Sequence, residues 1–181
     1  MAVLPEQEVV AKEPSYNYGK ILFFICVCFS VSSFSQETLS ELLKKHNNQS
    51  IPYISVQELA MPKTEAIVLD ARELSEFEVS HLKNAIYIGY SKFQIDSIQD
   101  KIKDKDQIIV VYCSLGIRSE DIAEKLKSSG YTNVLNLYGG IFEWKNKDFK
   151  VFNSEEKETD NIHVFNELWS KWLTKGTKIY E

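Results

Sequence analysis

Short apolar runs alternate with amphipathic stretches through the middle of this 181-residue chain. Apolar runs of this length predict buried strands, and apolar residues at helical spacing predict helices between them. The expected strands are 53–54, 66–70, 86–88, 108–112 and 131–137. The expected helices are 37–47, 55–61, 73–79, 92–103 with Ser91 as its cap, 120–128, and one that Gly139 opens. The alternation predicts an α/β fold, in which parallel crossovers build an open, mainly parallel sheet with helices on both faces.

The N-terminal part departs from this alternation. Ile21 to Val31 is an apolar run of eleven residues that follows Lys20. A bilayer needs about 20 such residues, whereas the apolar core of a secretory signal peptide is this short. The run therefore predicts a signal peptide, cleaved before Gln36, and export to the periplasm. The alternatives are a short membrane anchor and a lipoprotein acylated on Cys26 or Cys28.

The C-terminal part departs from it as well. Residues 153–160 are acidic and polar, which predicts a surface linker. Beyond them the apolar residues that recur at helical spacing are Phe165, Leu168, Trp169, Trp172 and Leu173. They predict an aromatic C-terminal helix that packs on the rest of the chain. The alternatives are a docking surface for a protein partner and a lid over the site.

Composition narrows the function classes. A net charge of −5 with 44% hydrophobic residues is typical of a soluble globular protein, and no basic cluster points to nucleic acid. Cleavage before Gln36 would leave Cys113 as the one cysteine of the mature protein, which excludes an internal disulfide. A lone cysteine in an exported protein is a candidate reactive thiol, and the alternative is an inert, buried cysteine. The three histidines are dispersed, and we expect neither a metal site nor a cofactor.

Cys113 follows the apolar strand 108–112 and precedes a helix. A helix N-terminus has unpaired N–H groups and the positive end of the helix dipole. Such a setting lowers a cysteine pKa to roughly 3.5–7.5. Gly116 allows a tight turn, and Arg118 adds a permanent positive charge. The loop is therefore expected to hold a thiolate and an anionic group bound to it.

Further site residues are expected around this thiolate. Arg118 is expected to hold the oxyanion of a donor or to stabilise the product on sulfur, and its alternative role is a surface salt bridge. Backbone N–H groups toward the substrate are expected from Ser114, Leu115, Gly116, Ile117 and Ser119, the last also through its hydroxyl. Asp70 and Arg72 fall at the same sheet edge, where they either pair with each other or orient the loop against the substrate. His81 is expected to be structural.

Several motifs together resemble the rhodanese (sulfurtransferase) family over residues 50–150. They are Cys-x-x-Gly-x-Arg-Ser at 113–119, Leu-Asp-x-Arg at 69–72, Glu-Phe at 76–77, His-Leu-x-Asn-Ala-Ile at 81–86, and Gly-Gly-x-x-x-Trp at 139–144. The resemblance implies a rhodanese-like fold and a persulfide on Cys113. It also implies a small anionic sulfur donor such as thiosulfate and a thiol or cyanide acceptor. The chain then divides into a signal peptide or anchor (1–35), a helical extension (36–49), the rhodanese-like domain (50–150), and the linker with the aromatic helix (151–181).

The loop between Cys113 and Arg118 helps to separate activities within this resemblance. Its length looks like that of the sulfur-handling members, whereas the related cell-cycle dual-specificity phosphatases carry one residue more. The alternatives are a non-catalytic sulfur-carrier or protein-binding module that uses the aromatic tail, and a small-anion phosphatase or arsenate reductase. The loop lacks the extra cations of strong thiosulfate users, and Leu115 and Ile117 make its rim apolar. This departure argues against thiosulfate as the physiological donor.

Overall fold

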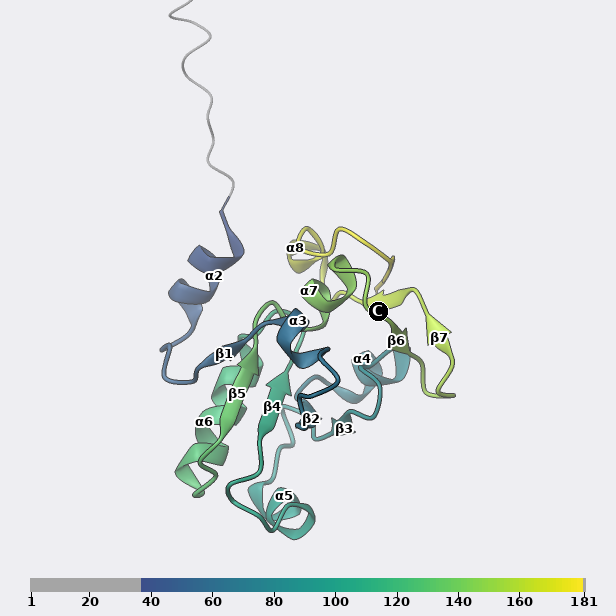
Figure 1. Cartoon of the computed structure of the whole chain (residues 1–181). Coiled ribbons are helices and arrows are strands. Elements are labelled where there is room, and N and C mark those ends of the chain that lie inside the picture. The colour runs from purple at the N-terminus through teal and green to yellow at the C-terminus, as the bar shows by residue number, and fades with distance from the viewer. Residues whose placement is uncertain (1–36, 181) are drawn as a thin grey trace, which may run out of the picture. The chain divides into compact units, whose positions relative to one another are not determined.

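The computed structural model describes residues 37–180, and the predicted signal peptide lies outside them. A five-stranded sheet of order β1-β5-β4-β2-β3 forms its centre (Figure 1), and every neighbouring pair in it is parallel. The strands are β1 (Tyr53–Ile54), β2 (Ile67–Asp70), β3 (Ile86–Tyr87), β4 (Ile109–Tyr112) and β5 (Val134–Leu137). The five expected strands are all present, and the predicted α/β fold with a mainly parallel sheet is confirmed.

Helices connect these strands and cover both faces of the sheet. They are α2 (Leu39–His46), α3 (Val56–Leu59), α4 (Leu74–Val79), α5 (Ile95–Lys101), α6 (Arg118–Ser128) and α7 (Gly140–Asn146). The side chain of Ser55 accepts the backbone N–H of Glu58 in a capping box that starts α3, as the sequence predicted. Helix α6 begins at Arg118, two residues earlier than expected, so this arginine lies in its first turn.

Alternate residues of β4 divide the core between the two faces, because successive side chains of a strand point in opposite directions. Val110 and Tyr112 pack into a cluster with α3, α7 and the C-terminal segment. Ile109 and Val111 pack into the other cluster, with α5 and α6. All four side chains are buried. The central strand is thus fixed from both sides, and the residue that follows it has a defined position.

The helix expected over 92–103 is shorter in the structure. Helix α5 begins at Ile95, and Ser91 does not cap it. The Ser91 hydroxyl instead donates to the Glu73 carboxylate at 2.5 Å, and the Ser91 backbone N–H donates to the same oxygen at 3.1 Å. The capping prediction was wrong because a carboxylate distant in sequence binds both donors.

The segment expected to be a linker is a hairpin. Strands β6 (Val151–Phe152) and β7 (Glu158–Thr159) pair in antiparallel fashion. The side chain of Asn153 accepts the backbone N–H groups of Glu155 and Lys157, both at 3.0 Å, and this closes the turn. The segment is on the surface, as expected, but it pairs as a hairpin, and composition alone does not reveal these local hydrogen bonds.

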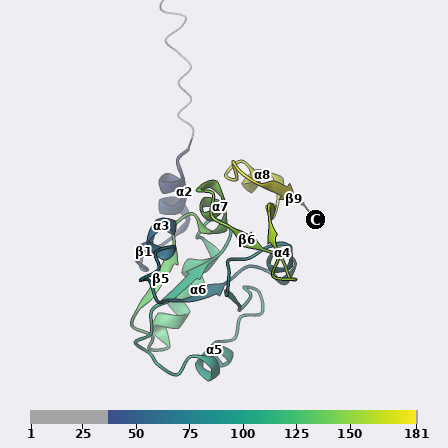
Figure 2. The same ribbon diagram turned by 45° about the vertical axis from the view of Figure 1, so that its right-hand side comes forward.

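The predicted aromatic helix is a single turn, α8 (Glu167–Ser170), between the parallel strands β8 (Asn161–His163) and β9 (Thr177–Ile179). In both views α8 lies beside α7 (Figures 1 and 2), and Asn146 of α7 donates to the carbonyl of Trp172 at 2.9 Å. Leu173 is buried, and both tryptophans of the segment pack on the core. Packing of the aromatic residues is therefore observed, although most of the helix is not. Over residues 37–180, no helix has the length and apolarity that a membrane crossing needs.

Candidate active site

Cys113 is the first residue after β4, and its loop runs directly into α6. The side chain is 2% exposed. Its Sγ accepts the backbone N–H of Gly116 at 3.1 Å and lies 3.5 Å from the Ser119 hydroxyl. Gly116 has a φ of +110°, which favours glycine and lets its N–H turn back toward the sulfur. The loop and the start of α6 thus bring the Gly116 N–H and the Ser119 hydroxyl to the sulfur, and both favour a thiolate.

Arg118 is paired within the site. Its guanidinium donates to both carboxylate oxygens of Glu76, at 2.6 and 2.8 Å, and to the Ser114 hydroxyl at 3.0 Å. The Ser114 hydroxyl in turn donates to Glu76 at 3.1 Å. Burial raises the pKa of the Glu76 carboxyl, but the hydrogen bonds and charge of Arg118 outweigh it, and the pKa lies below its usual value. Glu76 is therefore ionised, and it fixes the position of the arginine.

Opposing effects set the pKa of the Cys113 thiol. Burial raises this pKa because the charged form loses water. The positive charge of Arg118 and the hydrogen bonds from Ser119 and Gly116 lower it by more, so that the thiol ionises below its ordinary value. The sulfur is then a thiolate over a wider pH range than an ordinary cysteine, which is the form that acts as a nucleophile.

Replacing Ser119 by alanine is expected to raise the Cys113 pKa, because a hydrogen bond that favours the charged thiolate is lost. The measurement is the rate of iodoacetamide alkylation against pH, followed on the Cys113 peptide by mass spectrometry. The wild-type midpoint should lie below that of a free thiol, and S119A should move it upward. Ser128→Ala, on an exposed serine in the last turn of α6, is the matched control. An equal midpoint in S119A and wild type would contradict the assigned role.

Helix α7 holds the loop from its far side. The N–H of Ile141 donates to the Cys113 carbonyl at 2.9 Å, and that of Phe142 donates to the Ser114 carbonyl at 3.2 Å. A Cβ at Gly140 would lie 2.2 Å from the Cys113 carbonyl oxygen. The glycine pair at the start of α7 thus lies beside the site loop.

Two asparagines secure the turn at Gly116. The side chains of Asn136, in β5, and Asn47, just after α2, each donate to the Gly116 carbonyl at 2.8 Å. Asn136 also accepts the Ser119 hydroxyl at 2.7 Å. The Ser119 hydroxyl has one proton and two acceptors within reach, Asn136 at 2.7 Å and the sulfur at 3.5 Å, and it can donate to one of them at a time. The Gly116 carbonyl is therefore held by a side chain from β5 and by one from the residue after α2.

A pocket of about 180 Å³ opens onto the sulfur. Its lining residues are Cys113, Ser114, Leu115, Ile117, Arg118, Phe165 and Trp169. The Phe165 ring lies 5.0 Å from the Arg118 guanidinium carbon, a distance suited to a cation–π contact. Four predicted loop residues besides Cys113 therefore line the pocket, while Gly116 and Ser119 contact the sulfur from behind it.

Asp70 and Arg72 do not line this pocket. Both are fully buried, and Arg72 donates to Asp70 at 2.6 Å and to the Ser80 carbonyl at 2.6 Å. Of the alternatives for this pair, the structure shows mutual pairing. His81 is also buried and stacks on Phe77 with ring centroids 4.2 Å apart, as expected for a structural residue. In the part of the chain that is described, no cluster of three or more potential metal ligands occurs.

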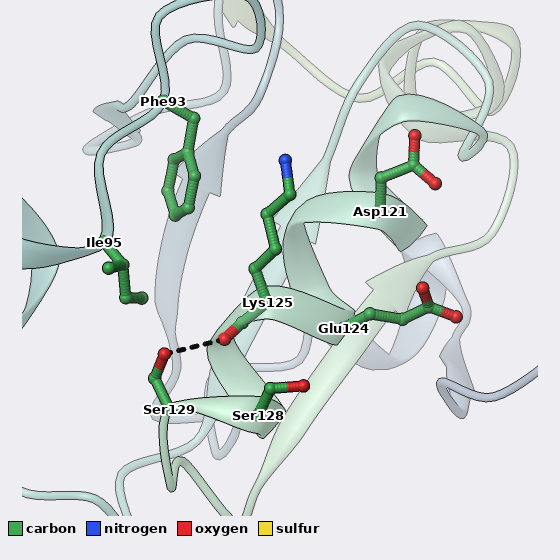
Figure 3. A pocket seen from close by; sticks show the side chains of 7 residues that line it. All are labelled: Phe93, Ile95, Asp121, Glu124, Lys125, Ser128 and Ser129. Atoms are coloured by element: carbon green, nitrogen blue, oxygen red, sulfur yellow. Dashed lines mark hydrogen bonds between the residues drawn. The ribbon is translucent and has the colours of Figure 1, made fainter.

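A wider depression of about 790 Å³ lies between α6 and the segment that leads into α5 (Figure 3). Its lining residues are Phe93, Ile95, Asp121, Glu124, Lys125, Ser128 and Ser129. Ser129 donates to the Lys125 carbonyl, and Cys113 is not among the lining residues. The smaller pocket at Cys113 is therefore the candidate active site.

Two residues of the site were missed as such in the sequence. Glu76 was noted within a motif but given no role, although it is the partner of Arg118. Asn136 is a polar residue inside the apolar run 131–137, and it is fully buried. A buried amide in a strand needs hydrogen-bond partners, so its position was the available signal. Phe165 and Trp169 were considered as a lid, and they do line the pocket.

Comparisons with known proteins agree with this geometry. The rhodanese-like domain family matches residues 55–147. Thiosulfate sulfurtransferase GlpE of Coxiella burnetii is 31% identical over 97 residues, which cover 54% of this chain and 87% of that protein. The tRNA uridine(34) hydroxylase of Erwinia tasmaniensis is 40% identical over 83 residues, which cover 44% of this chain but only 24% of that protein.

A solved structure shows the same fold. Thiosulfate sulfurtransferase from Pseudomonas aeruginosa superposes with a TM-score of 0.53 at 18% identity, over 68% of this chain and 23% of that one. The family match over residues 55–147 includes β2, β4 with the cysteine loop, β5 and α7. The chain therefore belongs to the rhodanese-like domain family, whose members include sulfurtransferases.

Proposed function

We propose that this protein is a sulfurtransferase that carries sulfane sulfur as a persulfide on Cys113. The observation that carries the proposal is the setting of the Cys113 sulfur, which accepts the backbone N–H of Gly116. Cys113 lines the pocket together with Arg118, whose guanidinium is held in place by Glu76. The lowered pKa of the Cys113 thiol increases the fraction of thiolate, the nucleophilic form, at neutral pH. A match to a relative named thiosulfate sulfurtransferase, over most of that relative's length, supports the same activity.

The reaction has two displacement steps. The Cys113 thiolate attacks the outer sulfur of the donor, the sulfur–sulfur bond of the donor breaks, and the leaving group departs with the electron pair. An acceptor thiolate or cyanide then attacks the outer sulfur of the persulfide and restores the Cys113 thiolate. Each step forms one bond to sulfur and breaks one, so no external oxidant or reductant is needed. Ping-pong kinetics are expected because the enzyme exists in two covalent forms.

Arg118 and the loop amides have separate tasks in these steps. The Gly116 N–H, 3.1 Å from the sulfur, favours negative charge on the Cys113 thiolate. It does so in the first step, in which the thiolate attacks, and in the second step, in which the Cys113 sulfur is the leaving group. Arg118 lowers the thiol pKa through its charge and lies in the pocket wall, where it can face the donor. Because the lowered thiol pKa favours the thiolate, the proposed reaction needs no separate general base.

Intact-mass spectrometry tests the proposal. Treatment of the protein with thiosulfate or an organic thiosulfonate is expected to add the mass of one sulfur atom, located on the Cys113 peptide. Cyanide should then remove this mass and release thiocyanate. Absence of the added sulfur with every donor would overturn the proposal and leave a non-catalytic binding module.

A further inference from the structure

The pocket over Cys113 has a wall from outside the family match. Phe165 and Trp169 lie beyond residue 147, where the match ends, yet both line the pocket. Phe165 has a φ of +65°, which a bulky residue rarely adopts, and its N–H donates to the His163 ring at 3.1 Å. The side chain of Asn166 accepts the N–H of Trp169 and starts α8. Specific contacts therefore hold this aromatic wall in place.

The polar groups of the pocket are engaged with each other. Arg118 forms hydrogen bonds with both oxygens of Glu76, and its guanidinium also lies against the Phe165 ring. The Ser114 hydroxyl donates to the same glutamate. The surface that remains open to a ligand is almost entirely apolar. A ligand that fills this space gains more from apolar contact than from new hydrogen bonds.

The charges around the sulfur do not favour a doubly charged donor. Arg118 is the one cation among the pocket-lining residues of the described chain, and Glu76 offsets it. The nearby Arg72 is likewise offset by Asp70. When Cys113 is a thiolate, this group of charges is therefore negative overall. Each negative charge on a donor therefore lacks a partner here, so a doubly charged donor such as thiosulfate is disfavoured more than a singly charged one.

We propose that the sulfur donor is an organic molecule with an apolar group next to its sulfane sulfur, and that Phe165 and Trp169 determine this specificity. Such a donor is an organic thiosulfonate, R–SO₂–S⁻, or an organic persulfide, R–S–S⁻. The inference rests on the proposed function and defines its substrate class. In the transfer step the thiolate of Cys113 takes the outer sulfur, and the sulfinate R–SO₂⁻ or thiolate R–S⁻ leaves with the bonding electrons. Total charge is unchanged.

The test compares benzenethiosulfonate with thiosulfate at a fixed concentration of cyanide, using thiocyanate release as the readout. The two donors have the same sulfane sulfur, but one has a phenyl ring where the other has a charged oxygen. We expect Phe165→Ala to lower kcat/KM for benzenethiosulfonate about tenfold or more, through lost apolar contact. For thiosulfate, kcat/KM should stay equal or rise, because the same change exposes Arg118. Trp169→Ala should shift the ratio in the same direction.

Controls separate specificity from folding. Leu168→Ala lies in the same segment, 69% exposed and outside the pocket lining, and should leave the ratio of the two kcat/KM values unchanged. Phe165→Leu keeps an apolar wall and should restore most of the preference. A misfolded variant would lose both donors together. If F165A and W169A turn over both donors with an unchanged ratio of the two kcat/KM values, this inference alone is overturned. If the wild type shows neither turnover nor a persulfide, the proposed function is overturned as well.

Discussion

Replacement of Cys113 by serine is expected to abolish sulfur transfer, with a loss in kcat of at least about a thousandfold. A serine hydroxyl is not ionised at neutral pH, and it cannot form a persulfide. The Gly116 N–H and the Ser119 hydroxyl, which contact the sulfur, would still find an oxygen acceptor. The fold should therefore persist while the chemistry is lost. The measurement is thiocyanate release from either donor with cyanide.

The control for this variant is its thermal stability. The melting temperature of C113S should lie close to that of the wild type, because serine has nearly the same shape and the site retains its donors. Persulfide formation should be undetectable by intact mass. Turnover of C113S equal to that of the wild type would show that another group transfers the sulfur.

Replacement of Gly140 by alanine is expected to destabilise the protein by about 2–5 kcal/mol and to remove most activity. The added Cβ would lie 2.2 Å from the Cys113 carbonyl oxygen and 2.7 Å from the carbonyl carbon of Ser114. Both carbonyls accept N–H groups of α7, so loop and helix would have to separate. The φ of +54° at this residue adds backbone strain. Chemical denaturation and kcat/KM are the measurements.

Gly130→Ala is the matched control for this effect. Gly130 also has a positive φ, +94°, but a Cβ there would meet nothing within 4 Å. The variant therefore reports backbone strain alone, which we expect to be about 1 kcal/mol, with normal kcat/KM. If G140A were no less stable and no less active than G130A, close packing of α7 on the loop would have no role in the site.

The sequence was sufficient for the sheet and for the cysteine loop because both are local patterns. An apolar run followed by polar residues and an amphipathic helix determines a strand, a loop and a helix in that order, as in β4 and α6. The pairing of Asp70 with Arg72 was also among the alternatives, since the two residues lie only two apart. Such contacts depend on spacing along the chain.

The rest depended on contacts between residues distant in sequence. Glu76 and Arg118 are 42 residues apart, and no periodicity relates them. The tail shows the same limit: its aromatic spacing fits a helix, but pairing of β8 with β9 and burial of Leu173 leave only one helical turn. Tertiary contacts therefore override the local preference there, and they place Phe165 on a pocket wall, a position that the spacing alone left as one of several alternatives.

The hydrogen bond from Asn47 to the Gly116 carbonyl has a consequence for how this chain is divided. Asn47 lies before the matched residues 55–147, and Phe165 lies after them, yet each borders the reactive sulfur's loop or pocket. The segment that matches the family and the set of residues that form the candidate site thus have different boundaries. Substitutions at Asn47 or Phe165 would therefore alter the site from outside the family match.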